Sequence, residues 1–227
     1  MVNIGETIAD IGTDHGYVPM LLIKKGISPR AIMSDISEAS LSKAKETFAL
    51  SGLTADERDF RIGDGLSPIE YAEVDTVIIA GLGGHTITDL LSADESKTRS
   101  YKRFILQPRK HSGALRFYLY THGFDITDEV LSTEGKFECE IIAAIPGEDT
   151  NRIAPYPAND IRWKYPISMV MANPESARKR VEWKIESIKE QIANLEQSHR
   201  DRTELIDILR SDLDYLNDLI KISQNSY

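Results

Sequence analysis

The sequence predicts an α/β fold in which a mostly parallel sheet, closed by an antiparallel pair of strands, is followed by a hairpin of two long helices. Apolar runs alternate with amphipathic stretches up to about Pro146, which is the pattern of successive strand and helix units in a parallel sheet. Two further strand-like runs are separated only by a short polar stretch, as in an antiparallel hairpin. Beyond them, two apolar repeats have the spacing of packed helices.

Each unit of the expected sheet is a short apolar run followed by an amphipathic stretch. We expect parallel strands at residues 7–11, 31–35, 59–62, 74–80 and 103–107. We expect helices at residues 17–25, 37–50, 84–91 and 112–122. The runs 124–131 and 137–145 are separated by the polar stretch 132–136, which contains Gly135, so we expect them to pair antiparallel.

The chain changes character after the expected sheet. The next stretch carries Pro146, Pro155, Pro157 and Pro166 with little periodicity, so we interpret it as a linker or a wrapped segment. One helical seam then consists of Val181, Ile185, Ile188, Ile192 and Leu195, and a second of Ile206, Leu209, Leu213, Leu216 and Ile220. The register breaks at residues 198–203, where Asp201 and Glu204 resemble a capping box. We therefore expect a sheet domain at residues 1–147, a linker at 148–168 and a coiled-coil helical hairpin at 169–227.

Composition restricts the class of protein. The chain has 227 residues and a net charge of −9, so RNA contacts would have to come from local clusters of Lys and Arg. Candidate clusters are Lys97, Arg99, Lys102 and Arg103, then Arg109 and Lys110, then Arg178, Lys179 and Arg180, although a solvated face is the favoured interpretation of each one taken singly. The single Cys139 excludes an internal disulfide, and no set of side chains has metal-ligand spacing. Without a membrane-spanning run or a secretory signal, we expect a cytoplasmic protein, and we expect it to be a monomer.

The stretch most informative about function is IADIGTDHG at residues 8–16, an apolar strand that enters a glycine-bearing turn and opens a helix. A dinucleotide site uses glycines here so that the backbone can approach a pyrophosphate, but Asp10 and Asp14 would repel phosphate. S-adenosylmethionine has no phosphate and carries an ammonium and a sulfonium group, so an acidic turn suits this cofactor. A tight strand-to-helix turn with no ligand is the alternative interpretation.

The later strand ends also carry polar or glycine-rich turns. Asp35 ends the second strand, where a carboxylate can bind ribose hydroxyls, and Asp64 follows the third, where it can accept a hydrogen bond from an adenine amine. Either residue can instead cap a helix or form a turn. The fourth strand ends in AGLGGH at residues 80–85, where we place the methyl-acceptor pocket. The fifth ends in QPRK at residues 107–110, whose amide can contact a base edge and whose cations can meet phosphates.

These motifs, in this order, resemble those of the bacterial tRNA (adenine-22-N1)-methyltransferases, the TrmK-type family of class I methyltransferases. The matching segments are ADIGTDHGYVP at 9–19, GDGL at 63–66, IAGLGG at 79–84, FILQP at 104–108, and residues 135–141 and 160–163. The chain departs from the family pattern at residues 1–6, where a basic helix is usual, at Ser34 and Asp35, where Gly and Glu are usual, and at Arg109, where Asn is usual. The resemblance implies a Rossmann-like domain that binds S-adenosylmethionine and a helical hairpin that assists tRNA binding.

The residues and the resemblance together define a candidate site. The expected cofactor-binding residues are Asp10, Gly12, Asp14, His15, Gly16, Tyr17, Asp35, Ile36, Gly63, Asp64, Gly65, Ala80, Gly81, Gly83 and Gly84. The expected RNA-binding residues are Gln107, Pro108, Arg109, Lys110, Arg178, Lys179 and Arg180. Methylation of adenine N1 places a positive charge on a flipped base, so we expect Asp14 or Asp64 to stabilise it and Gln107 to position the base. The alternatives are a methyltransferase of another RNA or a small molecule, and a cofactor-binding interaction module that has lost catalysis.

Overall fold

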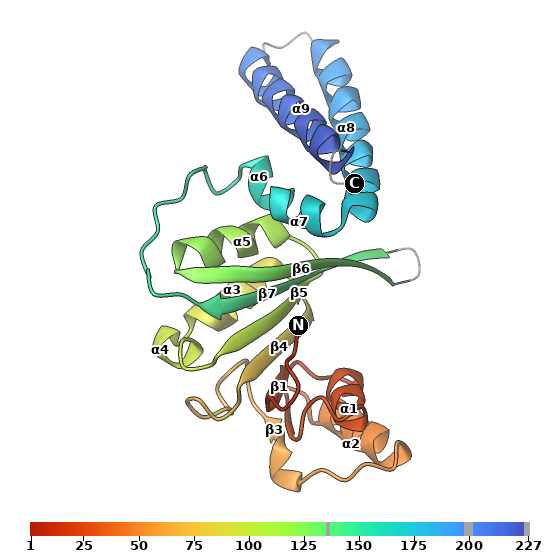
Figure 1. Cartoon of the computed structure of the whole chain (residues 1–227), viewed down its shortest axis with the longest axis vertical. Coiled ribbons are helices and arrows are strands. Elements are labelled where there is room, and N and C mark those ends of the chain that lie inside the picture. The colour runs from red at the N-terminus through yellow and green to blue at the C-terminus, as the bar shows by residue number, and fades with distance from the viewer. Residues whose placement is uncertain (135–136, 198–201, 225–227) are drawn as a thin grey trace.

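The computed structural model describes residues 1–134, 137–197 and 202–224. One seven-stranded sheet carries helices on both faces, and a pair of long helices projects from it (Figure 1). The strands are β1 (Ile8–Ile11), β2 (Ala31–Asp35), β3 (Phe60–Ile62), β4 (Thr76–Leu82), β5 (Arg103–Pro108), β6 (Phe124–Glu134) and β7 (Phe137–Pro146). The α-helices are α1 (Tyr17–Lys24), α2 (Glu38–Leu50), α3 (Gly84–Ser92), α4 (Glu95–Thr98), α5 (Ser112–Thr121), α6 (Ile161–Lys164), α7 (Ile167–Ala172), α8 (Pro174–Glu196) and α9 (Thr203–Gln224).

The strand order β3-β2-β1-β4-β5-β7-β6 confirms the expected sheet. Strands β1 to β5 are parallel, whereas β7 pairs antiparallel with both β5 and β6. The chain moves outward from β1 to β3 in one direction and from β4 to β5 in the other, so the order reverses between β1 and β4. Ligands of open α/β sheets bind at the carboxyl ends of the strands beside such a reversal.

Successive residues of the central strands face opposite sides of the sheet. Ala9 lies in a core cluster with Leu91 of α3 and Leu115 of α5, whereas its neighbour Ile8 lies in a cluster with Phe48 of α2. Helices α3 and α5 therefore cover one face, and α1 and α2 cover the other. Because both faces are covered, the strands are nearly continuous apolar runs, which is why the sequence reveals them.

The expected strands and helices of the first five units are present with ends within two residues of their predicted positions. Ser37 begins α2 as its cap, since its hydroxyl accepts a hydrogen bond from the Ser40 backbone N–H at 3.3 Å. Helices α4, α6 and α7 were not predicted, because helices this short carry no helical periodicity. Helix α6 and the first residues of α7 lie in the stretch expected to be a linker.

Helices α8 and α9 lie side by side and are joined through residues 198–201, which lie outside the described residues together with the expected capping aspartate. Val181, Ile185 and Ile188 of α8 and Leu216 and Leu219 of α9 form one buried cluster. The predicted seam is thus the packing seam, whereas the coiled-coil supercoil stays a prediction.

The base of this helix pair packs on the sheet domain. The cluster between α8 and α9 also includes Met169 and Val170 of α7, with Leu131 of β6 packed against it. The Asn173 side chain accepts a hydrogen bond from the Leu131 backbone N–H at 3.0 Å and donates one to the Glu129 carbonyl at 3.1 Å. The domain boundaries at residues 147 and 168 stay a prediction, but the helices are fastened to the edge of the sheet rather than hanging from a loose linker.

Candidate functional site

The residues predicted from strand ends meet at one edge of the sheet. The pairing register sets Ile11 beside Ser34 and Ile79, Asp35 beside Ile62, and Ala80 beside Gln107. The turns that follow β1, β2, β3, β4 and β5 therefore begin at the same level. All five open around the reversal of strand order between β1 and β4.

The glycine turn after β1 depends on left-handed backbone. Gly12 has φ +71° and Gly16 has φ +65°, and Asp14 between them has φ +42°. A methyl group on Gly16 would lie 3.0 Å from the Ala44 Cβ of α2, so only glycine allows this close approach. A methyl group on Gly12 would meet nothing within 4 Å, so the backbone of the turn is open to a ligand.

Two carboxylates lie beside this turn. The Asp10 side chain is buried and accepts a hydrogen bond from the Thr13 hydroxyl at 2.7 Å. Burial raises the pKa of Asp10 to about 6, Thr13 counteracts this, and the nearby Asp35 carboxylate adds to it. Asp35 itself accepts backbone hydrogen bonds from Ser37 at 2.9 Å and Asp14 at 3.3 Å. No described cation lies in an ion pair with Asp10 or Asp35, so their negative charge is left for a cationic ligand.

Asp14 is exposed and differs from Asp10 in its partners. Lys43 of α2 approaches Asp14 at 3.0 Å, and this hydrogen bond lowers the pKa of the Asp14 carboxyl. His15 lies 3.6 Å from the same carboxyl and stacks on the ring of Tyr17 with centroids 5.3 Å apart. The sequence interpretation missed Lys43 and Thr13. Lys43 lies in α2, outside the glycine turn, and Thr13 lies within the turn but is neither charged nor a glycine.

The turn after β3 packs closely against α3. A methyl group on Gly65, which has φ +53°, would lie 2.5 Å from Leu90 of α3. Asp64 is exposed and has no ion pair within the described part of the chain, and Ile36 at the end of β2 is also exposed. The predicted cofactor residues of this turn are therefore at the edge of the sheet, with the Asp64 carboxylate accessible.

The turns after β4 and β5 are joined to each other. The Gly81 N–H donates to Gln107 Oε1 at 2.7 Å, and the Gly84 N–H donates to the Lys110 carbonyl at 2.8 Å. A methyl group on Gly84 would lie 2.2 Å from the carbonyl oxygen of His111, which itself has φ +60°. Glycine is thus required at residue 84 for the two turns to close on each other.

Arg109 and Lys110 fold back over the turn after β4. A methyl group on Gly81 would lie 3.7 Å from Arg109 Nε, and one on Gly83 would lie 3.6 Å from Lys110 Cε. Neither cation is ion-paired with any carboxylate that the structure describes. Both side chains are therefore exposed at the mouth formed by these turns, and their contact with RNA stays a prediction.

The structure separates the members of the cluster Arg178, Lys179 and Arg180, because the first two are exposed whereas Arg180 is not a free cation. Arg180 is mostly buried and bonds to Glu140 of β7, and Arg178 lies 3.7 Å from Glu182. Arg180 is consequently a packing residue of the helix pair and not an accessible RNA contact. A sequence cannot separate the three, because the difference lies in a partner forty residues away.

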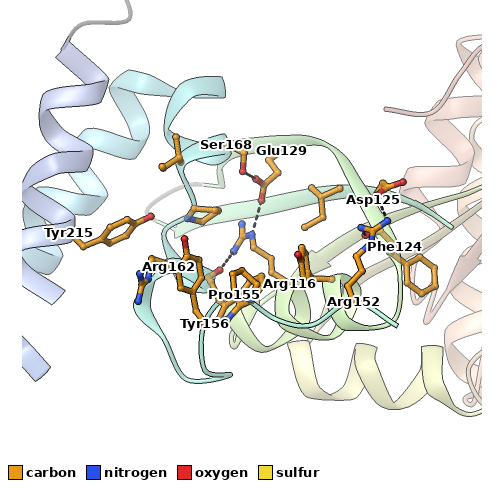
Figure 2. Close-up of a pocket in the computed structure, with 15 residues that line it drawn as sticks. Arg116, Phe124, Asp125, Glu129, Arg152, Pro155, Tyr156, Arg162, Ser168 and Tyr215 are labelled. Carbon is orange, nitrogen blue, oxygen red and sulfur yellow. Dashed lines mark hydrogen bonds and ion pairs between the residues drawn. The ribbon is translucent and has the colours of Figure 1, made fainter. Parts of the chain in front are cut away.

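A separate cavity of about 330 Å³ lies where the helix pair meets the sheet (Figure 2). Arg116 of α5 lines this cavity and donates a hydrogen bond to Glu129 at 2.7 Å. Glu129 also accepts a 2.5 Å hydrogen bond from the Ser168 hydroxyl. Arg116 also bonds to Glu140 at 2.7 Å, which joins α5, β6, β7 and α7 in one buried network. Each cation here is matched by a carboxylate, so the network fastens the helix pair to the domain.

Metal-holding groups and membrane-spanning helices are both absent from the part of the chain that the structure describes. No group of three or more His, Cys, Asp or Glu side chains there is arranged to hold a metal ion. No helix there is long and apolar enough to cross a bilayer.

Known proteins resemble this chain at the level of family and fold. The family described as "Methyltransferase domain" matches residues 1–142, so the sheet and its acidic glycine turn define a methyltransferase domain. A curated tRNA (adenine(22)-N(1))-methyltransferase of Bacillus subtilis is 32% identical over 211 residues, which cover 89% of this chain and 87% of the relative. The chain therefore belongs to the tRNA (adenine(22)-N(1))-methyltransferase family.

Solved structures share the whole architecture, including the helix pair. The Streptococcus pneumoniae protein Sp1610 matches with a TM-score of 0.80 at 22% identity, covering 97% of this chain and 95% of that one. TrmK of M. capricolum, solved in complex with S-adenosyl-homocysteine, matches with a TM-score of 0.77 at 20% identity, covering 98% and 94%. At this level of identity the likeness establishes the fold.

Proposed function

We propose that this protein transfers the methyl group of S-adenosylmethionine to N1 of adenine 22 in tRNA, acting as a monomer in the cytoplasm. The observation that carries the proposal is the buried Asp10 carboxylate beside Asp35 at the reversal of strand order, with no cation of the described residues paired to either. Membership of the tRNA (adenine(22)-N(1))-methyltransferase family supports the choice of acceptor, and the complex of the M. capricolum protein supports the choice of cofactor.

The residues at the edge of the sheet fit this cofactor. A carboxylate buried against one hydroxyl donor suits the ammonium or sulfonium of the ligand, because a nearby opposite charge favours the ionised form. The open backbone at Gly12 leaves room for the ligand, Asp35 is placed for the ribose hydroxyls, and Asp64 is placed for the adenine amine. When bound, S-adenosylmethionine supplies an electrophilic methyl group. The chain's task is then to align donor and acceptor, where most of the rate gain in a direct displacement originates.

Gln107 is placed to orient the acceptor base. Its Oε1 is occupied by the Gly81 N–H, so the side-chain amide is fixed and its N–H groups remain to donate to a base edge. Adenine N1 lies on the pairing edge, so the base must leave its helix to enter the mouth. The positive charge that develops on the ring is stabilised by a nearby carboxylate. Because Asp64 is assigned to the adenine amine of the cofactor, Asp14, which lies 3.0 Å from Lys43, is the remaining candidate for this role.

Labelled methyl donor and bulk tRNA test the proposal directly. After digestion to nucleosides, the label should appear as N1-methyladenosine, and a transcript with guanosine at tRNA position 22 should receive none. Asp35→Asn should weaken cofactor binding at least tenfold by calorimetry while the far-ultraviolet spectrum stays unchanged. A label found on guanine or cytosine, or transfer to the guanosine-22 transcript, contradicts the proposal.

A further inference from the structure

A second cavity, of about 620 Å³, adjoins the mouth on the side of the helix pair. It is lined by His85 and Thr88 of α3, by His111 and Phe117 at α5, and by Asn159 and Lys164 beside and within α6, among others. The cavity begins at the residues that join the turns after β4 and β5. None of the residues predicted to bind the cofactor or RNA lines this cavity.

Two exposed histidines stand at the entrance of this cavity. His85 follows the glycine turn after β4 and His111 follows Lys110, and their rings lie with centroids 4.5 Å apart at an angle of 44°. The left-handed backbone of His111 and the closed joint at Gly84 fix this arrangement. Exposed aromatic rings beside cationic side chains are a surface on which nucleic-acid bases stack.

Lys164 stands on the far wall of the cavity and is held there by backbone packing. A methyl group on Gly113 would lie 3.2 Å from the Lys164 backbone nitrogen, and Arg116 bonds to the adjacent Trp163 carbonyl at 3.2 Å. The end of α6 is therefore seated directly on the first turn of α5. Partial burial, and then the nearby cations of Lys184 and Arg180, lower the pKa of Lys164.

Lys184 continues the same line onto α8. It lies one helical turn beyond Arg180, whose bond to Glu140 fixes this part of α8 beside the sheet. Neither Lys164 nor Lys184 forms an ion pair with a carboxylate in the described part of the chain. The acidic groups nearby are mostly engaged, since Asp160 bonds to Arg162 at 2.6 Å. Asp212 of α9 also faces Lys184, and its pKa is raised by burial.

We infer that Arg109, Lys110, Lys164 and Lys184 form a cationic track that guides the RNA strand from the mouth to the helix pair, with His85 and His111 as the platform for a base beside the target. Most other cations that the structure describes are paired with carboxylates or carbonyls, so the track is a local exception on a chain of net charge −9. RNA fits this pattern because it presents regularly spaced phosphates together with unstacked bases. The inference rests on the proposed function, since it takes tRNA as the ligand.

Salt-dependent tRNA binding tests the track. Lys164→Ala and Lys184→Ala, singly and together, are compared with Lys189→Ala, a matched control on α8 whose ammonium is paired with Glu186 at 2.7 Å. Fluorescence anisotropy of labelled tRNA at several KCl concentrations gives the affinity and the slope of log K against log salt. Each substitution in the track should reduce that slope by about 0.7 to 0.9 and weaken binding severalfold at low salt. The control should change neither quantity.

His85→Ala separates stacking from charge. It should weaken tRNA binding by roughly fivefold or more with little change in the salt slope, because stacking on a base is not an ionic contact. Calorimetric affinity for S-adenosylmethionine should equal that of the parent in every variant, which also shows that each variant folds.

The failure of the track and the failure of the proposed function give different results. If the parent methylates tRNA but the Lys164→Ala, Lys184→Ala double variant keeps the parent's affinity and slope, the track is wrong and the function stands. If the parent binds tRNA through the track but forms no N1-methyladenosine on any tRNA, the proposed function is wrong and the track stands. Equal losses in Lys189→Ala and in the track variants would also overturn the track.

Discussion

Replacing Asp10 by asparagine should stabilise the protein and weaken its cofactor binding at the same time. Asp10 is buried, and its pKa rises from 3.8 to about 6 on folding. Each pH unit by which a pKa moves corresponds to about 1.4 kcal/mol, so ionised Asp10 lowers the free energy of unfolding by on the order of 3 kcal/mol. Asparagine keeps an oxygen for the Thr13 hydroxyl and carries no charge.

The sign of the pH dependence follows from the raised pKa. A carboxyl that holds its proton more tightly in the folded protein loses stability as the pH rises from about 4 to about 6, and the loss is complete above pH 6. At pH 8, Asp10→Asn should therefore unfold at a higher urea concentration than the parent, with a free energy of unfolding that is greater by about 1 to 3 kcal/mol. The free energies of unfolding of the two proteins should converge near pH 4. Asp89→Asn, which changes an exposed carboxylate of α3, is the matched control and should show no such difference.

Cofactor affinity should change in the opposite direction. Parent affinity for S-adenosylmethionine should increase as the pH rises through 6, because the ligand's cation needs ionised Asp10. Asp10→Asn should bind at least tenfold more weakly at pH 8 and lose that pH dependence, which calorimetry at pH 5, 6, 7 and 8 can measure. An Asp10→Asn protein that is less stable than the parent at pH 8, or that binds the cofactor as tightly, would refute the placement of Asp10.

Three further substitutions test the contact between the turns after β4 and β5 and the ion pairs that hold α8 to the sheet. Gly84→Ala should lower the free energy of unfolding in urea by about 1 to 3 kcal/mol, because its methyl group would lie 2.2 Å from the His111 carbonyl; it should slow methyl transfer more than it weakens cofactor binding. Arg116→Met should lower the same free energy by about 3 to 5 kcal/mol at pH 7.5, since the buried Glu129 loses its ion pair and Glu140 is left with Arg180. Arg180→Ala should be milder, because Glu140 keeps Arg116, and hydrogen exchange should rise at the start of α8 but not in α3; equal destabilisation by both arginine substitutions would contradict this order.

The secondary structure was predictable where the periodicity was strong. Strands buried on both faces are nearly continuous apolar runs, so β1, β2, β4 and β5 stand out in the sequence. The short helices α6 and α7 were missed because four and six residues are too few to show a helical repeat, and prolines surround them. Their position was decided by packing, through Trp163 and Tyr165, and not by local preference.

Residues of the candidate site at strand ends were predictable from the sequence, whereas cations outside recognisable motifs were not. The position of Asp10, Asp35 and Gly81 at one edge of the sheet was predictable from the sequence, because the carboxyl ends of parallel strands meet there whatever else surrounds them. Lys164 and Lys184 were not found, since one lies in an expected linker and the other on a helix without a distinguishing motif.

The sequence by itself determined the fold class, the antiparallel pair that closes the sheet and the acidic glycine turn, because these follow from the alternation of apolar runs and from residue type at strand ends. Tertiary structure alone decided which cations are free. Arg180 is neutralised by Glu140 from a distant strand, whereas Arg109 and Lys110 fold over the turn at residues 81–84 without a carboxylate. The physical reason is that an ion pair depends on distance in space, and residues far apart in the sequence come within a few ångströms only when the chain is folded.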